Sequence, residues 1–482
     1  MVHQDGTIMS VAQREFAQHY PEPGWVEHDP EELWRSTLDS ARAAIAASSD
    51  RPRAIGITNQ RETLVLWERA TLRPVAPAIV WQDRRTAERC RELRAAGRES
   101  DVRGRTGLVL DPYFTATKLE WLLRDPELRR RADRGELAAG TVDSWLIARL
   151  TGGRVHATDP TNASRTLLYN LATAGWDPWL TELFGVPQAL LPGIVPSSGV
   201  IAETEAELFG ASIPIAGVAG DQQAALFGQG CVTPGDAKNT YGTGAFLLVY
   251  TGEAPPVPGP GLLATAACGA GGRPGFALEG SVFIAGAALQ WLRDGLGLIE
   301  RSADSEALAR SVPDTGGVYF VPAFVGLGSP HWEPEARGTI TGLTRGTTRA
   351  HLVRAGLEAM AFSSSDLLEA MLASAGHRLT RFRVDGGATS NDWLMQFQAD
   401  LLGVPVERPD CVETTALGAA CLAGLATGVW PTVEAFTATR RFTRFEPGSN
   451  PSDRARRTTE WRRALEAALH WARSRSPAGS TA

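Results

Sequence analysis

The chain has 482 residues, of which 43% are hydrophobic and 21% charged, and its formal net charge is −6. This length exceeds what one hydrophobic core usually organises, so we expect two domains of similar size. The acidic balance argues against a polyanion-binding surface such as one for nucleic acid. The five cysteines are scattered without a Cys-x-x-Cys pair, which excludes a disulfide framework and a zinc site. No long apolar run and no secretory pattern appear, so we expect a cytoplasmic protein without membrane insertion.

The first half of the chain alternates short apolar strands with helices. Asp29, Pro30 and Glu32 have the types preferred at the N-cap, N1 and N3 positions of a helix, which should run to about Ala47. Strands are expected at 54–58, 63–67 and 78–81, and a charged helix at 86–96. This alternation predicts an α/β fold with a sheet of mixed direction.

The second half repeats the alternation. We expect strands at 245–250, 318–322 and 382–385, with helices at 284–295, 351–374 and 391–402. The segment 228–236 is the predicted hinge, so the domains should span residues 1–228 and 237–450. An Arg-rich amphipathic helix is predicted over 451–473, with Trp461, Leu465, Ala468 and Ala472 on one face. Residues 474–482 are expected to be a disordered tail.

Two glycine turns carry the chemistry. In the first, Gly220 precedes Asp221 and Gln222; the second is Gly242-Thr243-Gly244. A carboxylate can take a proton from an alcohol, and bare N–H groups of a glycine turn can approach a polyphosphate closely. Together they indicate phosphoryl transfer onto a hydroxylated substrate, with Asp221 as general base. The alternative is that Asp221 merely caps the helix that starts at Gln222.

The small number of lysines, and the residues around them, exclude two other kinds of nucleotide-binding site. The chain contains only Lys118 and Lys238, and neither lies in a Gly-Lys-Ser/Thr or a Val-Ala-x-Lys sequence. A Walker-type P-loop and a protein-kinase fold are therefore excluded.

A second polar motif, Asn59-Gln60-Arg61-Glu62-Thr63, follows a predicted strand. Arg61 can donate to two hydroxyl oxygens and Glu62 can accept from hydroxyl groups, as a polyol site requires. The alternative is a solvated surface ion pair. Trp81 and Phe246 would supply apolar walls for such a site, or else pack in the core.

These motifs resemble the FGGY carbohydrate kinases, which belong to the actin–hexokinase superfamily. The resemblance rests on the unbroken run 56–63, on 113–122, and on 338–343 followed by 351–358, and it extends over nearly the whole chain. A departure from the family pattern is Gly356, in the middle of a predicted helix. The resemblance implies two ribonuclease H-like domains flanking a catalytic cleft.

Site residues carried over from the family fall into two groups. The substrate group is Arg61, Glu62, Trp81, Tyr113, Asp221, Gln222 and Phe246. The nucleotide group is Gly242, Thr243, Gly286, Gln290, Gly387 and Asn391. The resemblance further implies ATP with Mg²⁺ as cofactors, glycerol as the phosphorylated substrate and a homodimer or homotetramer. The alternatives are a kinase of another polyol or pentulose, and a non-catalytic relative that binds polyol or nucleotide.

The family's opening strand and first phosphate turn have no counterpart here, so the resemblance implies that the first strand of domain I is missing. An Asp of that turn helps to hold Mg²⁺ in the family, which leaves the metal ligand of this chain unknown. Either translation starts upstream of Met1 or the chain is a degenerate relative. In both cases we expect the 482-residue chain to fold poorly and to be inactive.

Overall fold

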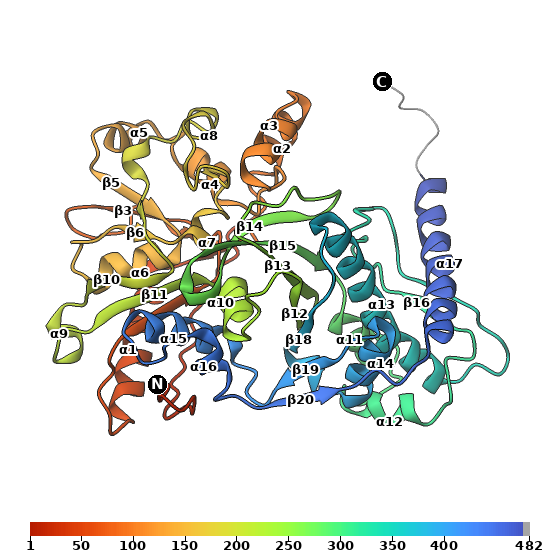
Figure 1. Cartoon of the computed structure of the whole chain (residues 1–482). Helices are drawn as coiled ribbons and strands as arrows, with labels where there is room; N and C mark the ends of the chain where they lie inside the picture. Colours follow the sequence, from red (N-terminus) through yellow and green to blue (C-terminus); the bar gives the residue numbers. More distant parts are fainter. Residues whose placement is uncertain (476–482) are drawn as a thin grey trace.

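The computed structural model describes residues 1–475. Two α/β halves lie side by side, the C-terminal one built on a seven-stranded sheet and the N-terminal one on several smaller sheets (Figure 1). Strand β12 pairs in parallel with β18 and antiparallel with β13, which confirms the predicted mixed direction. The predicted tail lies largely outside the described residues; the final helix continues through Arg475.

The elements of the N-terminal half are β1 (Glu27–His28), α1 (Pro30–Ala46), β2 (Ile55–Asn59), β3 (Val65–Glu68), β4 (Ala78–Ile79), α2 (Ala87–Ala95), α3 (Glu99–Thr106), α4 (Thr115–Leu122), α5 (Pro126–Asp133), β5 (Leu137–Gly140), α6 (Val142–Leu150), β6 (Ala157–Thr158), α7 (Pro160–Ala163), β7 (Tyr169–Asn170), β8 (Gly175–Trp176), α8 (Pro178–Leu183), β9 (Gly193–Ile194), β10 (Ser198–Glu203), α9 (Ala206–Phe209), β11 (Pro214–Gly220) and α10 (Asp221–Gly228).

The remaining elements are β12 (Asp236–Tyr241), β13 (Ala245–Gly252), β14 (Leu263–Cys268), β15 (Pro274–Val282), α11 (Gly286–Asp294), α12 (Asp304–Arg310), β16 (Tyr319–Val321), β17 (Thr339–Thr341), α13 (Arg349–Ala375), β18 (Arg381–Asp385), α14 (Asp392–Leu402), β19 (Val406–Pro409), α15 (Thr414–Ala426), α16 (Val433–Thr437), β20 (Phe442–Phe445) and α17 (Pro451–Arg475). Short 3₁₀ turns lie at Gln188–Leu190, Ala270–Gly272 and Gly387–Ser390.

The sheet order β10–β11–β2 positions the first glycine turn. Strands β11 and β2 are parallel, with Gly220 opposite Asn59 at their last residues. Because carboxyl ends of parallel strands meet at one edge of a sheet, the chain that follows β2 and the chain that follows β11 start side by side. Within residues 1–475, β2 is an end strand of this sheet.

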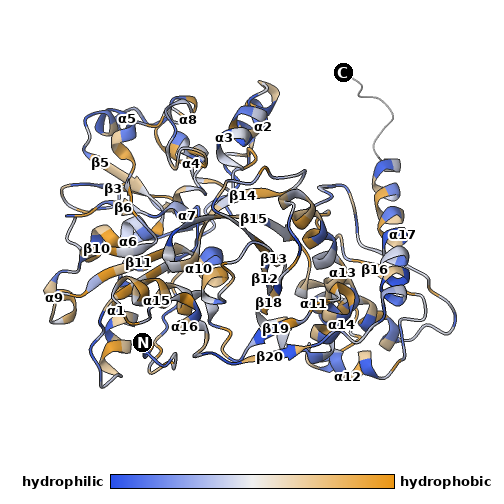
Figure 2. Ribbon diagram, in the orientation of Figure 1, coloured by the Kyte–Doolittle hydropathy of each residue, from blue (hydrophilic) through white to orange (hydrophobic). Residues whose placement is uncertain are grey.

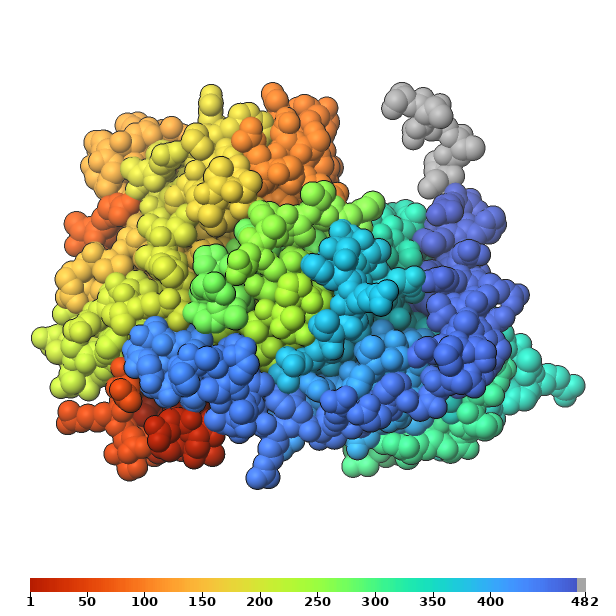
Figure 3. Space-filling view, in the orientation of Figure 1, coloured from red at the N-terminus to blue at the C-terminus, as the bar shows by residue number. Residues whose placement is uncertain are grey.

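Helix α15 packs on this sheet although it lies 350 residues downstream of β2. Glycines allow the approach: a Cβ at Gly56 would overlap the Ala419 carbonyl, and one at Gly217 would lie 2.6 Å from the Ala423 nitrogen. Figure 3 shows this C-terminal segment against the first residues of the chain, where the Trp430 indole donates to the Gln4 carbonyl at 2.7 Å. The helix therefore ties the two halves together.

The register of the seven-stranded sheet determines which side chains lie on the same face. Lys238 on β12 lies opposite Leu248 on β13, which lies opposite Glu279 on β15. Directly opposed residues of neighbouring strands point to the same face. Two residues along β13, Phe246 therefore shares that face.

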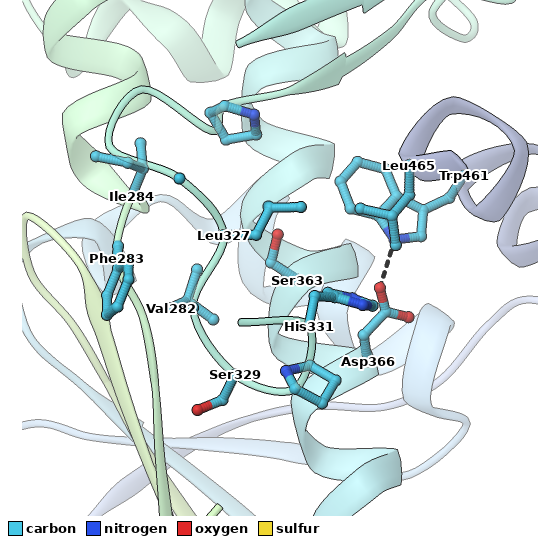
Figure 4. A pocket seen from close by; sticks show the side chains of 14 residues that line it. Val282, Phe283, Ile284, Leu327, Ser329, His331, Ser363, Asp366, Trp461 and Leu465 are labelled. Atoms are coloured by element: carbon cyan, nitrogen blue, oxygen red, sulfur yellow. Dashed lines mark hydrogen bonds between the residues drawn. The ribbon is translucent and has the colours of Figure 1, made fainter. Parts of the chain in front are cut away.

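Helix α17 closes the C-terminal half. Its predicted face of Trp461, Leu465, Ala468 and Ala472 is buried, while its outer surface is largely hydrophilic (Figure 2). Figure 4 shows the contact from within: the Trp461 indole donates to Asp366 Oδ2 on α13 at 2.6 Å. Burial raises the pKa of Asp366 to about 6.

The predicted helices and strands occur with ends displaced by a few residues at most. Asp29 caps α1, where its side chain accepts from the Glu31 N–H, and Asn391 caps α14 in the same way. The strand expected at 78–81 is shorter, because only Ala78 and Ile79 pair with β1. None of the helices described over residues 1–475 combines the length and apolar character that a membrane span needs.

Candidate active site

Asp221 is the first residue of α10, directly after β11. The N-cap position is held by Gly220, and Asp221 Oδ1 accepts from the neighbouring Gln222 N–H at 2.7 Å. Its side chain stays 35% exposed, and the Arg61 Nε lies 3.1 Å from Oδ1. The structure therefore brings Asp221 and Arg61 together at the common edge of β11 and β2.

Arg61 belongs to a buried network of two arginines and two glutamates. Its Nη1 and Nη2 donate to the two carboxylate oxygens of Glu279, at 2.6 and 3.1 Å. Arg165 donates to the same Glu279 at 3.0 Å and to Glu62 at 2.7 Å. The side chains of Arg61, Glu62, Arg165 and Glu279 are 4% exposed or less. Paired charges of this kind hold one geometry, because a buried ion without its partner is costly.

The network links the two halves of the chain. Glu279 comes from β15 of the seven-stranded sheet, whereas Arg61 follows β2 and Arg165 follows α7. Although burial opposes its ionisation, the guanidinium groups of Arg165 and Arg61 hold the pKa of Glu279 at about 2. The carboxylate is thus a permanent anion at neutral pH.

Of the aromatic candidates, Tyr113 lies beside this network, with its ring centroid 5.7 Å from the Arg165 Cζ atom. Trp81 and Tyr113 pack edge to face with ring centroids 5.6 Å apart, and both are half-buried. Burial raises the pKa of the Tyr113 phenol well above its ordinary value, so the hydroxyl is neutral and able to donate. Phe246 is also half-buried, on the same face of the sheet as Glu279.

Buried Lys118 forms hydrogen bonds with the backbone of two candidate site residues. It is 1% exposed, and its ammonium donates to the carbonyls of Tyr113 at 2.8 Å and Glu62 at 3.3 Å. Glu62 has φ +63°, a left-handed conformation that few non-glycine residues adopt. Burial lowers the pKa of Lys118 to about 7.

The nucleotide candidates lie on two turns at one edge of the seven-stranded sheet. Parallel strands β12 and β18 end together, with Thr240 opposite Asp385, so Gly242-Thr243 and Gly386-Gly387 emerge side by side. At Gly386, φ is +90° and a Cβ would overlap the Tyr241 carbonyl, so only glycine fits the turn. A Cβ at Gly387 would meet nothing within 4 Å, which leaves open space over the turn.

Helix α11 is joined to the first of these turns. The Gly286 N–H donates to the Gly242 carbonyl at 3.0 Å, and a Cβ at Gly286 would lie 2.6 Å from that oxygen. Gln290, four residues on, lies on the same helix face and is exposed. Asn391 Nδ2 donates to the Ser305 hydroxyl at 3.3 Å. The open space at Gly387 fits a nucleotide.

Lys238 connects the substrate side to the nucleotide side. Its ammonium donates to Gln222 Oε1 and to the Thr240 hydroxyl, both at 2.7 Å. Gln222 follows Asp221, and Thr240 lies two residues before Gly242. Lys238 thereby bridges the residue that follows Asp221 and the strand that leads into the glycine turn.

Comparison with known proteins identifies the family. Residues 1–228 match the N-terminal domain of the FGGY family of carbohydrate kinases, and residues 237–427 match its C-terminal domain. The chain belongs to the FGGY family.

Individual relatives of this FGGY protein are similar over nearly its whole length. The glycerol kinase of Dechloromonas aromatica is 57% identical over 472 residues, which cover 97% of this chain and 94% of that protein. The glycerol kinase of Carboxydothermus hydrogenoformans is 55% identical, covering 97% and 95%. Among solved structures, Plasmodium falciparum glycerol kinase with ADP superposes with a TM-score of 0.93 at 36% identity, covering 97% of this chain and 95% of that one.

Sequence analysis missed part of the buried network. Glu279, Arg165 and Gln223 were not predicted, although Gln223 Oε1 accepts from Arg61 Nη1 at 3.3 Å. A charged residue inside the apolar strand 276–280 was the available signal for Glu279. The two lysines were counted, but only the structure reveals that both are buried beside site residues.

Proposed function

We propose that this FGGY protein transfers the γ-phosphoryl group of ATP to glycerol, giving sn-glycerol 3-phosphate and ADP. The observation that carries the proposal is the half-exposed carboxylate of Asp221, 3.1 Å from an Arg61 guanidinium that is fixed by Glu279. The similarity to glycerol kinases over 97% of the chain supports this substrate class. We assign polyol binding to residues 1–228 and nucleotide binding to residues 237–450.

Asp221 acts as general base in this proposal and accepts the proton of a terminal hydroxyl as that oxygen attacks. When bound, ATP supplies the phosphoryl group and Mg²⁺ neutralises charge on its phosphates. Backbone N–H groups around Thr243 stabilise the phosphate oxygens. Trp81, Tyr113 and Phe246 enclose the carbon edge of the polyol and exclude water, so that the phosphoryl group does not go to water.

The hydrogen-bond inventory of Arg61 defines its role. Of five N–H groups, Nη1 uses two on Glu279 and Gln223, Nη2 uses one on Glu279, and Nε faces Asp221. One Nη2 N–H is left for a substrate hydroxyl, where the sequence suggested two. We propose that Arg61 orients Asp221 and holds one hydroxyl, while Glu62, Tyr113 and Gln222 hold the others.

The residues present are compatible with Mg²⁺. No group of three or more potential His, Cys, Asp or Glu ligands is found within residues 1–475. In kinases Mg²⁺ is held by one or two carboxylates together with the substrate phosphates, so a complete protein cage is not required. Asp221, with 35% of its side chain exposed, is the carboxylate of this site that could reach the metal.

The test is an ADP-release assay with purified protein, glycerol, ATP and Mg²⁺, in which turnover supports the proposal and refutes the expectation that the 482-residue chain is inactive. We expect Asp221→Asn to fold normally and to lose at least about 10²-fold in kcat. Asp101→Asn, an exposed helix position away from the site, serves as the control. An unchanged rate in Asp221→Asn would remove Asp221 from the role of base.

A panel of polyols and pentuloses separates glycerol from the related substrates of the family. The highest kcat/KM with glycerol is the expected outcome, and a higher value with a pentulose would reassign the substrate. Calorimetry distinguishes a non-catalytic relative, which would bind glycerol and ADP without turnover.

A further inference from the structure

A cavity of about 230 Å³ lies between α12, α13, α14 and α17. Its wall carries four arginines, Arg310, Arg354, Arg454 and Arg457, together with Trp393 and Asp400 among others. None of the residues assigned above to substrate or nucleotide lines it. The cavity is therefore a separate feature of the C-terminal half.

Two of the four guanidinium groups are already neutralised. Arg354 donates to Glu358 at 2.9 Å and to the Val312 carbonyl at 2.6 Å. Arg310 donates to Glu306 at 2.7 Å. Asp400, the acidic residue of the wall, is occupied as well: its Oδ1 accepts from the Gly448 N–H at 2.7 Å and from Gln396 at 3.1 Å.

The other two guanidinium groups, those of Arg454 and Arg457, have N–H donors without an acceptor in the described part of the chain. Within residues 1–475 the side chain of Arg454 makes no hydrogen bond and no ion pair. Arg457 Nε is buried without an acceptor, and the nearest carboxylate, Glu358, is 3.9 Å from Nη1 and already bonded to Arg354. Buried donors normally have a partner, so the Arg457 Nε–H favours an anion in the cavity, and the partly exposed Arg454 guanidinium adds a second positive charge beside it.

The geometry limits what that anion can be. Arg454 and Arg457 are three residues apart on α17 and so lie on one face of the helix. Phe397 lies under Arg457, with its ring centroid 5.4 Å from the Cζ atom, which restrains the planar guanidinium. Pockets for drug-sized ligands measure about 300–1,000 Å³, so this smaller one suits an ion or a small ester. The planar, multi-donor guanidinium group matches the oxygens of a phosphate group.

We propose that this cavity binds a phosphate group, either free phosphate or the phosphate of a small ester, between Arg454 and Arg457 of α17 and the wall formed by Arg310 and Arg354. A competing explanation is purely structural. The Arg454 guanidinium lies against Gly403, at the carboxyl end of α14, where a cation is favourable for the helix dipole even with the cavity empty.

The test is titration by isothermal calorimetry of the full chain with inorganic phosphate, and separately with glycerol 3-phosphate. Saturating ADP and glycerol are present throughout, to occupy the proposed active site, and Mg²⁺ is omitted so that ADP and glycerol 3-phosphate do not react in reverse. We expect saturable 1:1 binding that weakens about tenfold or more in Arg454→Met and in Arg457→Met, since each loses a charge-assisted hydrogen bond. Arg456→Met is the matched control, because Arg456 is on the same helix but 64% exposed.

Each possible result of these titrations either supports or overturns the phosphate site. Binding of inorganic phosphate identifies free phosphate as sufficient, whereas binding of the ester alone identifies the ester as the ligand. Both support the site, provided that the Arg454 and Arg457 variants lose affinity and Arg456→Met does not. Absence of saturable binding, or equal affinity in all variants, would overturn the proposal. In the structural explanation Arg454→Met lowers the melting temperature, and added phosphate does not raise that of the wild type.

Discussion

Glu279 is the residue on which the geometry of the proposed active site depends most. It accepts three hydrogen bonds from the guanidiniums of Arg61 and Arg165, at 2.6, 3.1 and 3.0 Å. In Glu279→Gln the shape is kept, but the charge is lost and an NH₂ group faces a guanidinium. The buried guanidinium groups of Arg61 and Arg165 would then have only the carboxylates of Glu62 and the half-exposed Asp221 as counter-charges.

The expected loss of stability follows from these three hydrogen bonds. Each charge-assisted hydrogen bond contributes about 1.5–3 kcal/mol, and breaking a buried ion pair costs about 3–5 kcal/mol in total. Since the Gln oxygen still accepts from one arginine, we expect the free energy of unfolding to fall by about 3–5 kcal/mol. We also expect kcat/KM for glycerol to fall at least about tenfold, because Arg61 is no longer held toward Asp221.

The assay is urea unfolding followed by far-ultraviolet circular dichroism at pH 7. Glu253→Gln is the control: Glu253 is 70% exposed and lies 3.5 Å from Arg273, so its loss should cost about 1 kcal/mol or less. The folded pKa of Glu279, about 2, lies below its unfolded value. Its contribution is therefore present above about pH 4.5 and is lost as the pH falls toward 2. Equal losses in Glu279→Gln and the control at pH 7 would refute the ionic network.

Two further predictions concern buried titratable groups. Lys118→Met leaves the carbonyls of Glu62 and Tyr113 without a donor, so steady-state kinetics should give a KM for glycerol raised about tenfold with kcat changed less; an unchanged KM would contradict this positioning role. The folded pKa of Asp366, about 6, lies above its unfolded value, so its neutral form favours folding and stability falls as the pH rises from about 4 to 6. Thermal unfolding across this range should show the fall in the wild type, whereas Asp366→Asn, which also keeps an acceptor for Trp461, should show it reduced or absent.

Local sequence was sufficient for the elements that were predicted, because their signals are local. Asp29 caps α1 and Asn391 caps α14, as their side-chain types predict. The face of α17 followed from helical periodicity. The expected length of β4 was wrong, since the apolar run 78–81 contains two residues that pair and two that do not.

The candidate site was predictable only in part. Asp221 and Arg61 stand 160 residues apart, yet Asp221 directly follows β11, Arg61 lies two residues after β2, and the parallel pairing of β11 with β2 brings them together. The roles assigned to Trp81, Phe246 and the nucleotide-turn residues stay predictions, which substitution and ligand binding can test. Glu279 gave a weak signal, because a single charge in a strand does not identify its partners.

The sequence by itself determined the helices and strands with strong local signals, the caps of α1 and α14, the family and the side chains able to accept a proton or hold hydroxyl groups. These properties depend on residue type and on spacing along a few turns of chain. Only the tertiary structure decided which charges neutralise one another: Arg61 and Arg165 meet Glu279 because the β12–β13–β15 register turns that carboxylate toward the other half of the chain. Such pairing is set by sheet register and by the cost of burying a lone charge, and both arise only when distant segments pack.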